Sequence, residues 1–447
     1  HLLRRPPFFD ELFTVWIARF PPDHILEALL HDSGPPLYYL LLHVLTGADP
    51  TVLGARALSF VAAAASFATV VTARRLGPAA LVAGLLLSVF APHAHFSAEG
   101  RAYALAGALA GAGCLALAAW SAEGRRARLA LGTLLLVLAA SAHYYGVLFF
   151  AIPFALGLLA RTRARIVEGF VASVAAGVAY IPGFLLAFRQ PPEAIEWMHA
   201  AGAAPAPLAP FAHLAFAAKY PEVFIAPPPP AVHLLALALT VAIGAIGARS
   251  PEARRWGVMT LVPVALVAAV GLAHDDVYFP VRFESVIAAP FVVWLAVSLG
   301  SVRRRWLRGA LATSVVVIGL FSSFIGLMTA VARPPDGWRD AAAFVKDTVP
   351  ETIPIVASRY AYLEVLSQKS EDWTPAVTAF PRELERHPGW ASASPEHLTA
   401  AELPPPPFVW VGERGSPEHR AIASRFVLRP LMTGRGMLVA EATTRKP

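Results

Sequence analysis

Residues 101–121 read RAYALAGALAGAGCLALAAWS, and after Arg101 this stretch carries no charged side chain. A helix needs about 20 apolar residues to cross a bilayer. Hydrophobic residues make up 56% of the 447-residue chain and charged residues 15%, whereas a soluble domain carries about 25% charged residues. The sequence therefore predicts an all-α polytopic membrane protein with about ten transmembrane helices. The candidate spans are 52–73, 79–93, 101–121, 128–142, 145–160, 166–188, 231–248, 256–273, 281–300 and 307–331.

Arginines occupy every second connection between these spans, and the intervening connections carry acids and histidine. The positive-inside rule assigns the arginine connections to the cytoplasm, so both chain ends are predicted to lie outside. Residues 36–46 are apolar but too short to cross, and a crossing there would invert this pattern, so we interpret them as interfacial or re-entrant. The arginines that set the orientation are Arg74, Arg75, Arg125, Arg126, Arg128, Arg161, Arg163, Arg165, Arg249, Arg254, Arg255, Arg303, Arg304, Arg305 and Arg308.

Composition limits the other classes of function. Topology explains the net charge of +7, so no nucleic-acid partner is predicted. Cys114 is the only cysteine, which excludes an internal disulfide and makes a cysteine metal site unexpected. Four of the 37 basic residues are lysine, a bias typical of GC-rich bacterial genomes, and we expect a multi-pass protein of the plasma (inner) membrane.

The chain divides into three predicted parts. Residues 1–50 form external juxtamembrane helices with a candidate catalytic loop, and their first helix has an apolar face suited to the membrane interface. Residues 51–332 form the transmembrane core. Residues 333–447 form a small extracytoplasmic α/β domain. The expected strands of this C-terminal domain are 353–358, 408–412 and 437–440, and its expected helix is 338–349. The apolar face of the first helix in residues 1–50 is made by Leu12, Phe13, Trp16, Ile17 and Phe20.

The predicted topology gathers polar side chains on the outer membrane face. Carboxylates near hydrocarbon are costly to hold and usually serve a function. A carboxylate can take a proton from an attacking hydroxyl, and arginine presents a fork of donors that matches phosphate. This combination suits a lipid-phosphate-linked donor. The candidate residues are Asp10, Glu11, Asp32, His93, His95, Glu99, Arg101, His143, Tyr144, Tyr145, Lys219, Asp275, Asp276, Tyr278 and Arg282.

Each candidate also has a purely structural interpretation. Asp10 could be the N-cap of a helix that starts at Glu11. Glu99 and Arg101 could pair with each other at the mouth of a span. His143, Tyr144 and Tyr145 could belong to an interfacial aromatic belt, which we favour for Tyr145. Asp275 and Asp276 could be solvated loop residues, and His93 with His95 lacks a convincing third metal ligand.

Several motifs follow one another along the chain. They are Phe9-Asp10-Glu11, Gly34-Pro35-Pro36-Leu37-Tyr38-Tyr39, Arg56-Ala57-Leu58-Ser59, Phe96-Ser97-Ala98-Glu99-Gly100-Arg101-Ala102-Tyr103, His143-Tyr144 and Tyr278-Phe279-Pro280-Val281-Arg282-Phe283. In their order and spacing these motifs resemble the GT-C superfamily of integral-membrane glycosyltransferases. The branch that is most similar contains the protein O-mannosyltransferases and the lipid A aminoarabinose transferases. The resemblance covers about residues 8–300 and rests on order more than on any single motif.

The resemblance implies transfer of a sugar from a polyprenyl-phosphate donor to a lipid, glycan or protein acceptor outside the cytoplasm. It implies that Asp10 is the catalytic general base, that displacement inverts the anomeric carbon, and that Glu11 supports the site or the helix start. Arg282, and with it Arg101, would hold the phosphate. Glu99 would position the acceptor or the sugar, or bind a divalent cation; no cofactor is otherwise implied.

Two departures and two alternative functions accompany the resemblance. Gly34 stands where the family usually has histidine, with Asp32 two residues earlier. The family's first span precedes the Asp-Glu pair, so we expect a preceding span to be missing from this sequence. A transporter or flippase of lipid-linked sugars is the first alternative, although it predicts charged or broken helices near mid-membrane. A non-catalytic scaffold is the second.

Overall fold

The computed structural model describes residues 7–191, 230–272, 282–332, 337–382, 403–434 and 436–444. Contacts divide the chain into two compact units, which we describe separately. The helical unit contains Ser33–Leu45 and Leu53–Arg333, and the mixed unit contains Pro6–Asp32, Thr46–Val52 and Pro334–Pro447. Among the sequence-based predictions, Lys219, the start of the proline run at 227–230, and Asp275, Asp276 and Tyr278 lie outside the described residues.

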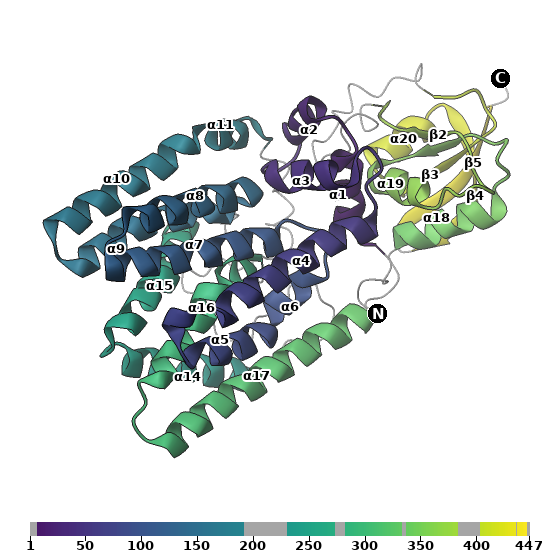
Figure 1. Cartoon of the computed structure of the whole chain (residues 1–447). Helices are drawn as coiled ribbons and strands as arrows, with labels where there is room; N and C mark the ends of the chain where they lie inside the picture. Colours follow the sequence, from purple (N-terminus) through teal and green to yellow (C-terminus); the bar gives the residue numbers. More distant parts are fainter. Residues whose placement is uncertain are drawn as a thin grey trace. The chain divides into compact units, whose positions relative to one another are not determined.

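Helices coincide with all ten predicted ranges of the helical unit (Figure 1). Its elements are α3 (Leu37–Thr46), α4 (Val52–Val71), η2 (Arg74–Leu76), α5 (Ala79–Ser88), α6 (Ala91–Ser97), α7 (Tyr103–Glu123), α8 (Arg126–Ala142), η3 (Tyr144–Ala151), α9 (Ile152–Ala160), α10 (Arg163–Ala179), α11 (Ile181–Arg189), α14 (Pro230–Gly247), α15 (Pro251–Gly271), α16 (Arg282–Gly300) and α17 (Arg305–Ala332).

The predicted count of about ten spans is not confirmed. Among the described residues, five helices are long and apolar enough to cross a membrane, or seven if each of two bent helix pairs is one span. Short helices account for the difference, because α8 has 17 residues and α9 has nine. Helix α3 has ten residues, about 15 Å, so it is too short to cross alone, as the interfacial or re-entrant interpretation expects. The chain is nonetheless an integral membrane protein with a mostly helical core.

Prolines explain both bent pairs. Helices α5 and α6 are bent by 64° and α10 and α11 by 46°, and a proline is the second residue of the second helix in each pair. Pro92 and Pro182 lack the N–H that would continue the preceding helix, and their rings clash with the previous turn. The predicted ranges 79–93 and 166–188 run across these breaks because hydropathy does not register a missing N–H.

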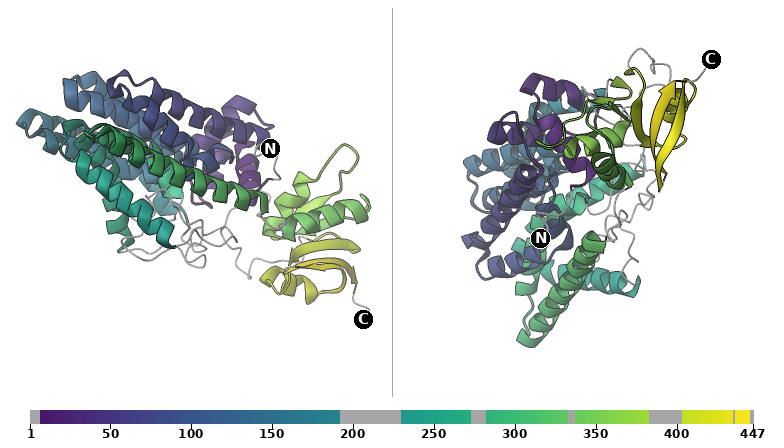
Figure 2. Two further views of the ribbon diagram at one scale, coloured as in Figure 1. Left: turned by 90° about the horizontal axis from the view of Figure 1, so that it is seen from below. Right: turned by 90° about the vertical axis from the view of Figure 1, so that its right-hand side faces the viewer.

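Helix α16 is the centre of the helical unit. Of the described helices long enough to cross a membrane it is the most buried, since 89% of the residues in its most apolar stretch are buried. Figure 2 shows the helices of this unit packed side by side, and α5, α7, α14 and α15 contact α16. Helix α7 approaches it closely through glycine: a Cβ at Gly107 would lie 2.6 Å from the Ser285 carbonyl oxygen, and one at Gly111 would lie 2.7 Å from the Ala289 Cβ. Glycines four residues apart are the small-residue pattern that lets membrane helices pack at short range.

Gly107→Ala is therefore expected to destabilise the helical unit by about 1–3 kcal/mol, because its methyl group would overlap backbone of α16. Thermal unfolding in detergent would measure the loss. Gly177→Ala in α10 is the matched control, since nothing lies within 4 Å of the position that its methyl group would take and alanine favours helix. Equal melting temperatures for the two variants would contradict the close packing of α7 on α16.

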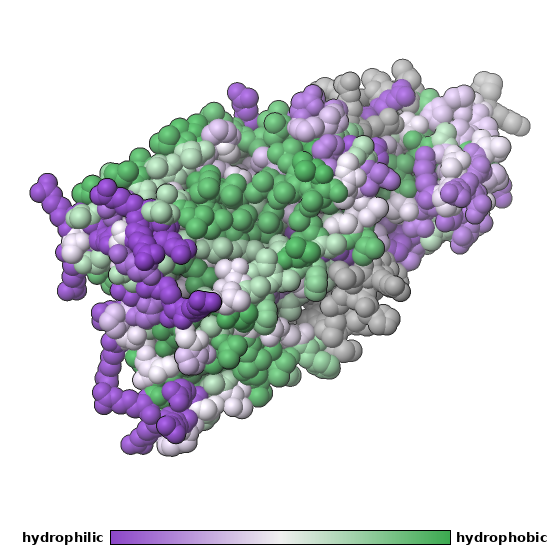
Figure 3. All heavy atoms as spheres, viewed as in Figure 1, coloured by the Kyte–Doolittle hydropathy of each residue, from purple (hydrophilic) through white to green (hydrophobic). Residues whose placement is uncertain are grey.

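The surface of the helical unit matches a membrane environment. Figure 3 shows apolar side chains over the face toward the viewer and hydrophilic ones at its left-hand end, where Figure 1 places the turns between α9 and α10 and between α14 and α15. Large apolar side chains are more than half exposed on several helices, including Leu134, Val171 and Phe324. Such a continuous apolar surface is rare on proteins in water and suits contact with lipid.

The mixed unit contains a five-stranded sheet in the order β2-β1-β3-β5-β4. The first three strands are parallel, and β5 runs antiparallel to both of its neighbours. The predicted strands at 353–358, 408–412 and 437–440 and the helix at 338–349 are confirmed. The elements are α1 (Phe9–Ala18), α2 (Pro22–Leu29), α18 (Gly337–Thr348), β1 (Ile355–Ala357), α19 (Arg359–Ser367), β2 (Val377–Ala379), β3 (Phe408–Glu413), α20 (Pro417–Ala423), β4 (Phe426–Gly434) and β5 (Met437–Thr444).

Helix α1 packs within this mixed unit, although its sequence predicts a helix on the membrane interface. The Trp16 ring meets the Tyr362 ring of α19 edge-on at 5.5 Å, and an Arg339 Nη2 donates to the Pro7 carbonyl oxygen. Leu12, Phe13, Trp16 and Ile17 are all buried. The apolar face is therefore covered by protein, through partners more than 300 residues away that a local pattern cannot reveal.

Candidate active site

The residues singled out from the sequence fall in both units. Asp10, Glu11 and Asp32 belong to the mixed unit, and the other members of the predicted set that the structure describes belong to the helical unit. Asp10, Glu11 and Asp32 are all buried. Burial of carboxylates is costly unless they are paired, hydrogen-bonded or neutralised, so each needs a local explanation.

The start of α1 explains Glu11 but not Asp10. The Glu11 carboxylate accepts a hydrogen bond from the Phe8 N–H at 3.0 Å, which satisfies a donor at the helix start. Phe8 is the N-cap and Asp10 lies inside the first turn, so the interpretation of Asp10 as the N-cap is wrong. The Asp10 carbonyl accepts from the Thr14 hydroxyl at 2.8 Å. Helix capping therefore does not account for the buried Asp10 carboxylate.

Three sequence motifs of the helical unit are joined by hydrogen bonds of two hydroxyl groups. Tyr38 donates to the Ala55 carbonyl at 2.7 Å, and its hydroxyl lies 2.9 Å from that of Ser59. Ser59 in turn donates to the Arg101 carbonyl at 3.0 Å. A Cβ at Gly100 would lie 2.8 Å from the Ala55 Cβ, so only glycine lets this turn approach α4. The motifs around residues 38, 59 and 101 thus fix the backbone of the turn between α6 and α7.

That turn carries Glu99, a buried carboxylate. Its Oε2 lies 3.1 Å from His95 Nε2 on α6, a partner that the sequence analysis did not pair with it. The Arg101 N–H donates to the Glu99 carbonyl at 2.7 Å. Among the described residues, no group of three or more His, Cys, Asp or Glu side chains is arranged to hold a metal ion.

A ladder of rings connects α6, α7, η3 and the start of α16. Successive ring centroids lie 4.3 Å apart for Phe96 and Tyr103, 4.7 Å for Tyr103 and His143, and 4.8 Å for His143 and Tyr145. Tyr145 then meets Phe283 at 5.5 Å. Tyr145 is therefore buried between His143 and α16, and its assignment to an interfacial aromatic belt is wrong.

Arg282, the first residue of α16, lies over this ladder. Its guanidinium carbon is 5.6 Å from the Tyr103 ring centroid, within the range of a cation–π contact. Arg282 and Arg101 both lower the pKa of His143, which places two positive charges near that imidazole. The helical unit thus brings together Glu99, Arg101, Tyr103, His143 and Arg282 of the predicted set.

His143 is held as a neutral imidazole. Its Nδ1 accepts the Tyr145 N–H at 3.2 Å, so the proton of the neutral ring is on Nε2. Burial, followed by the charges of Arg282 and Arg101, lowers its pKa to about 3. A hydrogen-bond donor that carries no charge therefore lies beside two arginines at physiological pH.

Tyr144 has a different role from its neighbours. Its hydroxyl donates to Gln190 Oε1 at 2.7 Å, and Gln190 Nε2 donates to the Gly34 carbonyl at 2.9 Å. Tyr144 thus connects η3 with the loop before α3 through the residue that ends α11. Sequence reasoning missed Gln190, because a single amide after an apolar helix gives no signal of its own.

The depressed pKa of His143 predicts a pH dependence of stability. An imidazole with an unfolded pKa near 6.5 and a folded pKa of about 3 takes up its proton on unfolding, so the folded state loses stability as pH falls below about 6.5. The loss is expected to approach about 1.4 kcal/mol per pH unit between pH 6 and pH 4. His143→Asn keeps a side-chain acceptor at the N-cap and removes this titration. Melting temperatures of wild type and His143→Asn, measured from pH 4 to pH 8, would check this prediction. If the two proteins lost stability in parallel as pH fell, that result would contradict a buried neutral His143.

Comparisons with known proteins give a structural likeness. No protein-family model matches the chain, and no curated protein matches its sequence. ArnT from Cupriavidus metallidurans in the apo state is 12% identical, with 96% of this chain and 93% of that chain covered and a TM-score of 0.56. ArnT bound to undecaprenyl phosphate is also 12% identical, with 98% and 94% covered and a TM-score of 0.59. At this identity the likeness establishes the fold.

A third structure is similar more loosely. The archaeal oligosaccharyltransferase AglB from Archaeoglobus fulgidus, in complex with an inhibitory peptide and a dolichol-phosphate, is 13% identical and has a TM-score of 0.44. It covers 91% of this chain, whereas this chain covers 65% of AglB. A score at this level adds nothing to the fold established by ArnT.

Proposed function

Since this chain has the GT-C fold, we propose that it is a glycosyltransferase that moves a sugar from a polyprenyl-phosphate donor to an acceptor hydroxyl. The acceptor is a lipid, a glycan or a protein. The positive-inside pattern supports a site on the extracytoplasmic face of the plasma membrane. Fold alone does not define an activity, so the proposal depends on the side chains at the start of α16.

The observation that carries the proposal is the position of Arg282 over Tyr103, beside Arg101 and a neutral His143. Two guanidinium groups and an uncharged imidazole donor are a suitable set for a phosphate group. ArnT, whose fold covers almost the whole chain, binds undecaprenyl phosphate in its crystal structure. We assign the lipid phosphate of the donor to Arg282 and Arg101.

The reaction we propose is a direct displacement at the anomeric carbon. The acceptor oxygen forms its bond to that carbon while the bond to the phosphate oxygen breaks, so the configuration inverts. The lipid phosphate leaves with the electron pair, and the acceptor proton passes to Asp10 as general base. The arginines stabilise the negative charge that develops on the leaving phosphate. Glu11 accepts the Phe8 N–H at the start of α1 and so supports the first turn of that helix. Asp32 and Glu99 position the sugar or the acceptor. Alternatively, Glu99 binds a divalent cation.

A transporter of lipid-linked sugars is the alternative, and one observation favours it. The bent pairs α5–α6 and α10–α11 are broken helices of the kind that line transport pathways. Both breaks, however, have a local cause in proline. A flippase would move the intact donor across the bilayer and leave the sugar–phosphate bond unbroken.

The test uses the full chain reconstituted in liposomes with a panel of polyprenyl-phosphate sugars and lipid acceptors. Release of free polyprenyl phosphate, with the sugar appearing on the acceptor, is the expected result, and the donor that reacts identifies the sugar. Movement of intact donor between leaflets with no release would replace the proposal by transport. If folded protein showed no release and no movement of the donor, the scaffold alternative would remain.

A further inference from the structure

Arginines in the connections of the helical unit fall into two groups. The first group is paired with acids, and its members therefore have an internal explanation. The second group has no acidic partner within the described ranges, and Arg249, Arg303 and Arg304 are the members of it that line one cavity. The pairs of the first group are Arg75 with Glu123 at 3.0 Å, Arg125 with Glu123 at 3.3 Å, Arg126 with Glu168 at 2.8 Å, Arg165 with Glu168 at 3.1 Å, and Arg255 with Glu252 at 2.6 Å.

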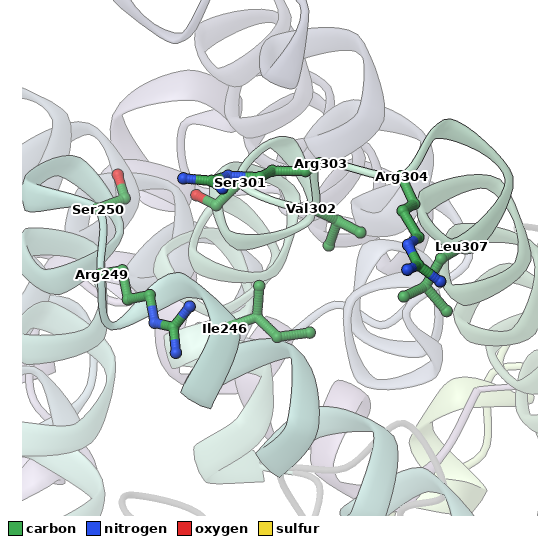
Figure 4. Close-up of a pocket in the computed structure, with 8 residues that line it drawn as sticks. All are labelled: Ile246, Arg249, Ser250, Ser301, Val302, Arg303, Arg304 and Leu307. Carbon is green, nitrogen blue, oxygen red and sulfur yellow. The ribbon is translucent and has the colours of Figure 1, made fainter.

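Three arginines of the second group, Arg249, Arg303 and Arg304, line one cavity. It has a volume of about 460 Å³ and lies between the α14–α15 turn and the α16–α17 turn. Ser250 and Ser301 add hydroxyl groups to its wall, and Ser250 is also the N-cap of α15. In Figure 4 the three arginines lie apart from one another, with the apolar Ile246 and Val302 between them. Three positive charges around one cavity favour an anion there.

The lining is amphipathic. Ile246, Val302 and Leu307 share the cavity with the arginines, and Trp306 on the same turn of α17 is 68% exposed. Exposed tryptophan marks the level of the lipid headgroups in membrane proteins. The cavity therefore lies where a charged headgroup and the first part of an acyl chain meet.

This cavity is separate from the candidate active site. Arg282 is the first residue of α16 and Gly300 is its last. Ser301, Arg303 and Arg304, which line the cavity, follow Gly300 in the turn between α16 and α17. A helix of 19 residues is about 28 Å long, close to the thickness of the hydrocarbon core. The cavity thus lies at the opposite membrane face from the phosphate site assigned to Arg282 and Arg101.

We propose that this cavity binds the phosphate headgroup of an anionic membrane lipid. Arg249, Arg303 and Arg304 hold the phosphate through guanidinium forks, and Ser250 and Ser301 lie within the wall as further polar groups. Three positive charges favour a net anionic lipid over a zwitterionic one. The acyl chains pass over Ile246 and Leu307 into the bilayer. The binding is independent of the proposed sugar transfer.

Native mass spectrometry of the full chain tests this binding in a zwitterionic detergent with added phosphatidylglycerol, phosphatidylcholine or inorganic phosphate. Wild type is expected to retain one phosphatidylglycerol. Arg249→Ala/Arg303→Ala/Arg304→Ala is expected to weaken that binding on the order of 100-fold, since each basic residue at an anionic surface contributes several-fold. The phosphatidylcholine arm is expected to show little binding.

A second triple variant removes the same charge elsewhere. Arg74, Arg128 and Arg163 are exposed in other basic connections and do not line this cavity, so their replacement by alanine is expected to change binding by less than about threefold. Equal losses in both triple variants would overturn the proposal in favour of general surface charge. Saturation by millimolar inorganic phosphate with no gain from the lipid would overturn the assignment to a lipid. Unchanged melting temperatures in lipid-free detergent would verify that both variants fold.

Discussion

Asp10→Asn is expected to lower the turnover of sugar transfer by about 10²–10⁴-fold while leaving donor binding within a few-fold of wild type. Asparagine has the size and shape of aspartate and keeps the first turn of α1, but its amide cannot take the proton of the acceptor hydroxyl. Glu11, not Asp10, accepts the Phe8 N–H at the start of the helix, so the substitution keeps that hydrogen bond. Release of polyprenyl phosphate under saturating donor measures turnover.

Asp23→Asn is the matched control for this experiment. Asp23 lies in the first turn of α2, in the same unit, and is exposed. Its replacement removes the same charge with an expected change of less than about twofold. Transfer at the wild-type rate by Asp10→Asn would remove Asp10 from the mechanism, and equal losses in both variants would indicate a general effect of charge on the unit.

Glu11→Gln separates support of the helix from chemistry. Glutamine keeps an oxygen that can accept the Phe8 N–H, so the cap and the fold are expected to persist with a small loss of activity. Transfer within about tenfold of wild type would agree with a supporting role. A loss as large as that of Asp10→Asn would make Glu11 part of the proton transfer, against the roles proposed above.

Hydropathy and charge were sufficient to locate the helices of the core, because each predicted range depends only on local composition. The same patterns could not fix the number of spans. The breaks at Pro92 and Pro182 depend on a missing backbone N–H, which hydropathy does not record. Helix α8 depends on where the helix ends, and hydropathy places that boundary only roughly. Three strands and one helix of the mixed unit were also predictable from alternation and period. Helix α19 was missed, although its Tyr362 covers α1.

The candidate site shows the same division between local and distant information. Residue type and motif order selected Glu99, Arg101, Tyr103, His143 and Arg282, and the structure of the helical unit brings these together. The neutral state of His143 was not predictable, because it results from burial and from two arginines on other elements. Tyr144 was selected for its motif, yet its bond to Gln190 makes it a connector of loops.

Arg282→Ala is expected to reduce kcat/KM for the donor by about 100-fold, because the leaving phosphate loses a charge-assisted partner at a half-buried position. Arg282→Lys is expected to recover part of this loss, since lysine restores the charge without the planar fork. Arg128→Ala, at an exposed position in the first turn of α8, is the control and is expected to behave as wild type. A wild-type kcat/KM for Arg282→Ala would remove Arg282 from the donor site.

The pH profile of Arg282→Ala separates its two effects. Arg282 helps to lower the pKa of His143, so its removal lets that pKa rise from about 3, while burial and Arg101 still hold it below 6.5. At pH 8 His143 is then neutral in both proteins, and any loss that remains there belongs to the contact with phosphate. A loss that grows as pH falls toward 5 belongs to protonation of His143. Full recovery at pH 8 would mean that Arg282 acts only through His143, which would contradict its assignment to the donor phosphate.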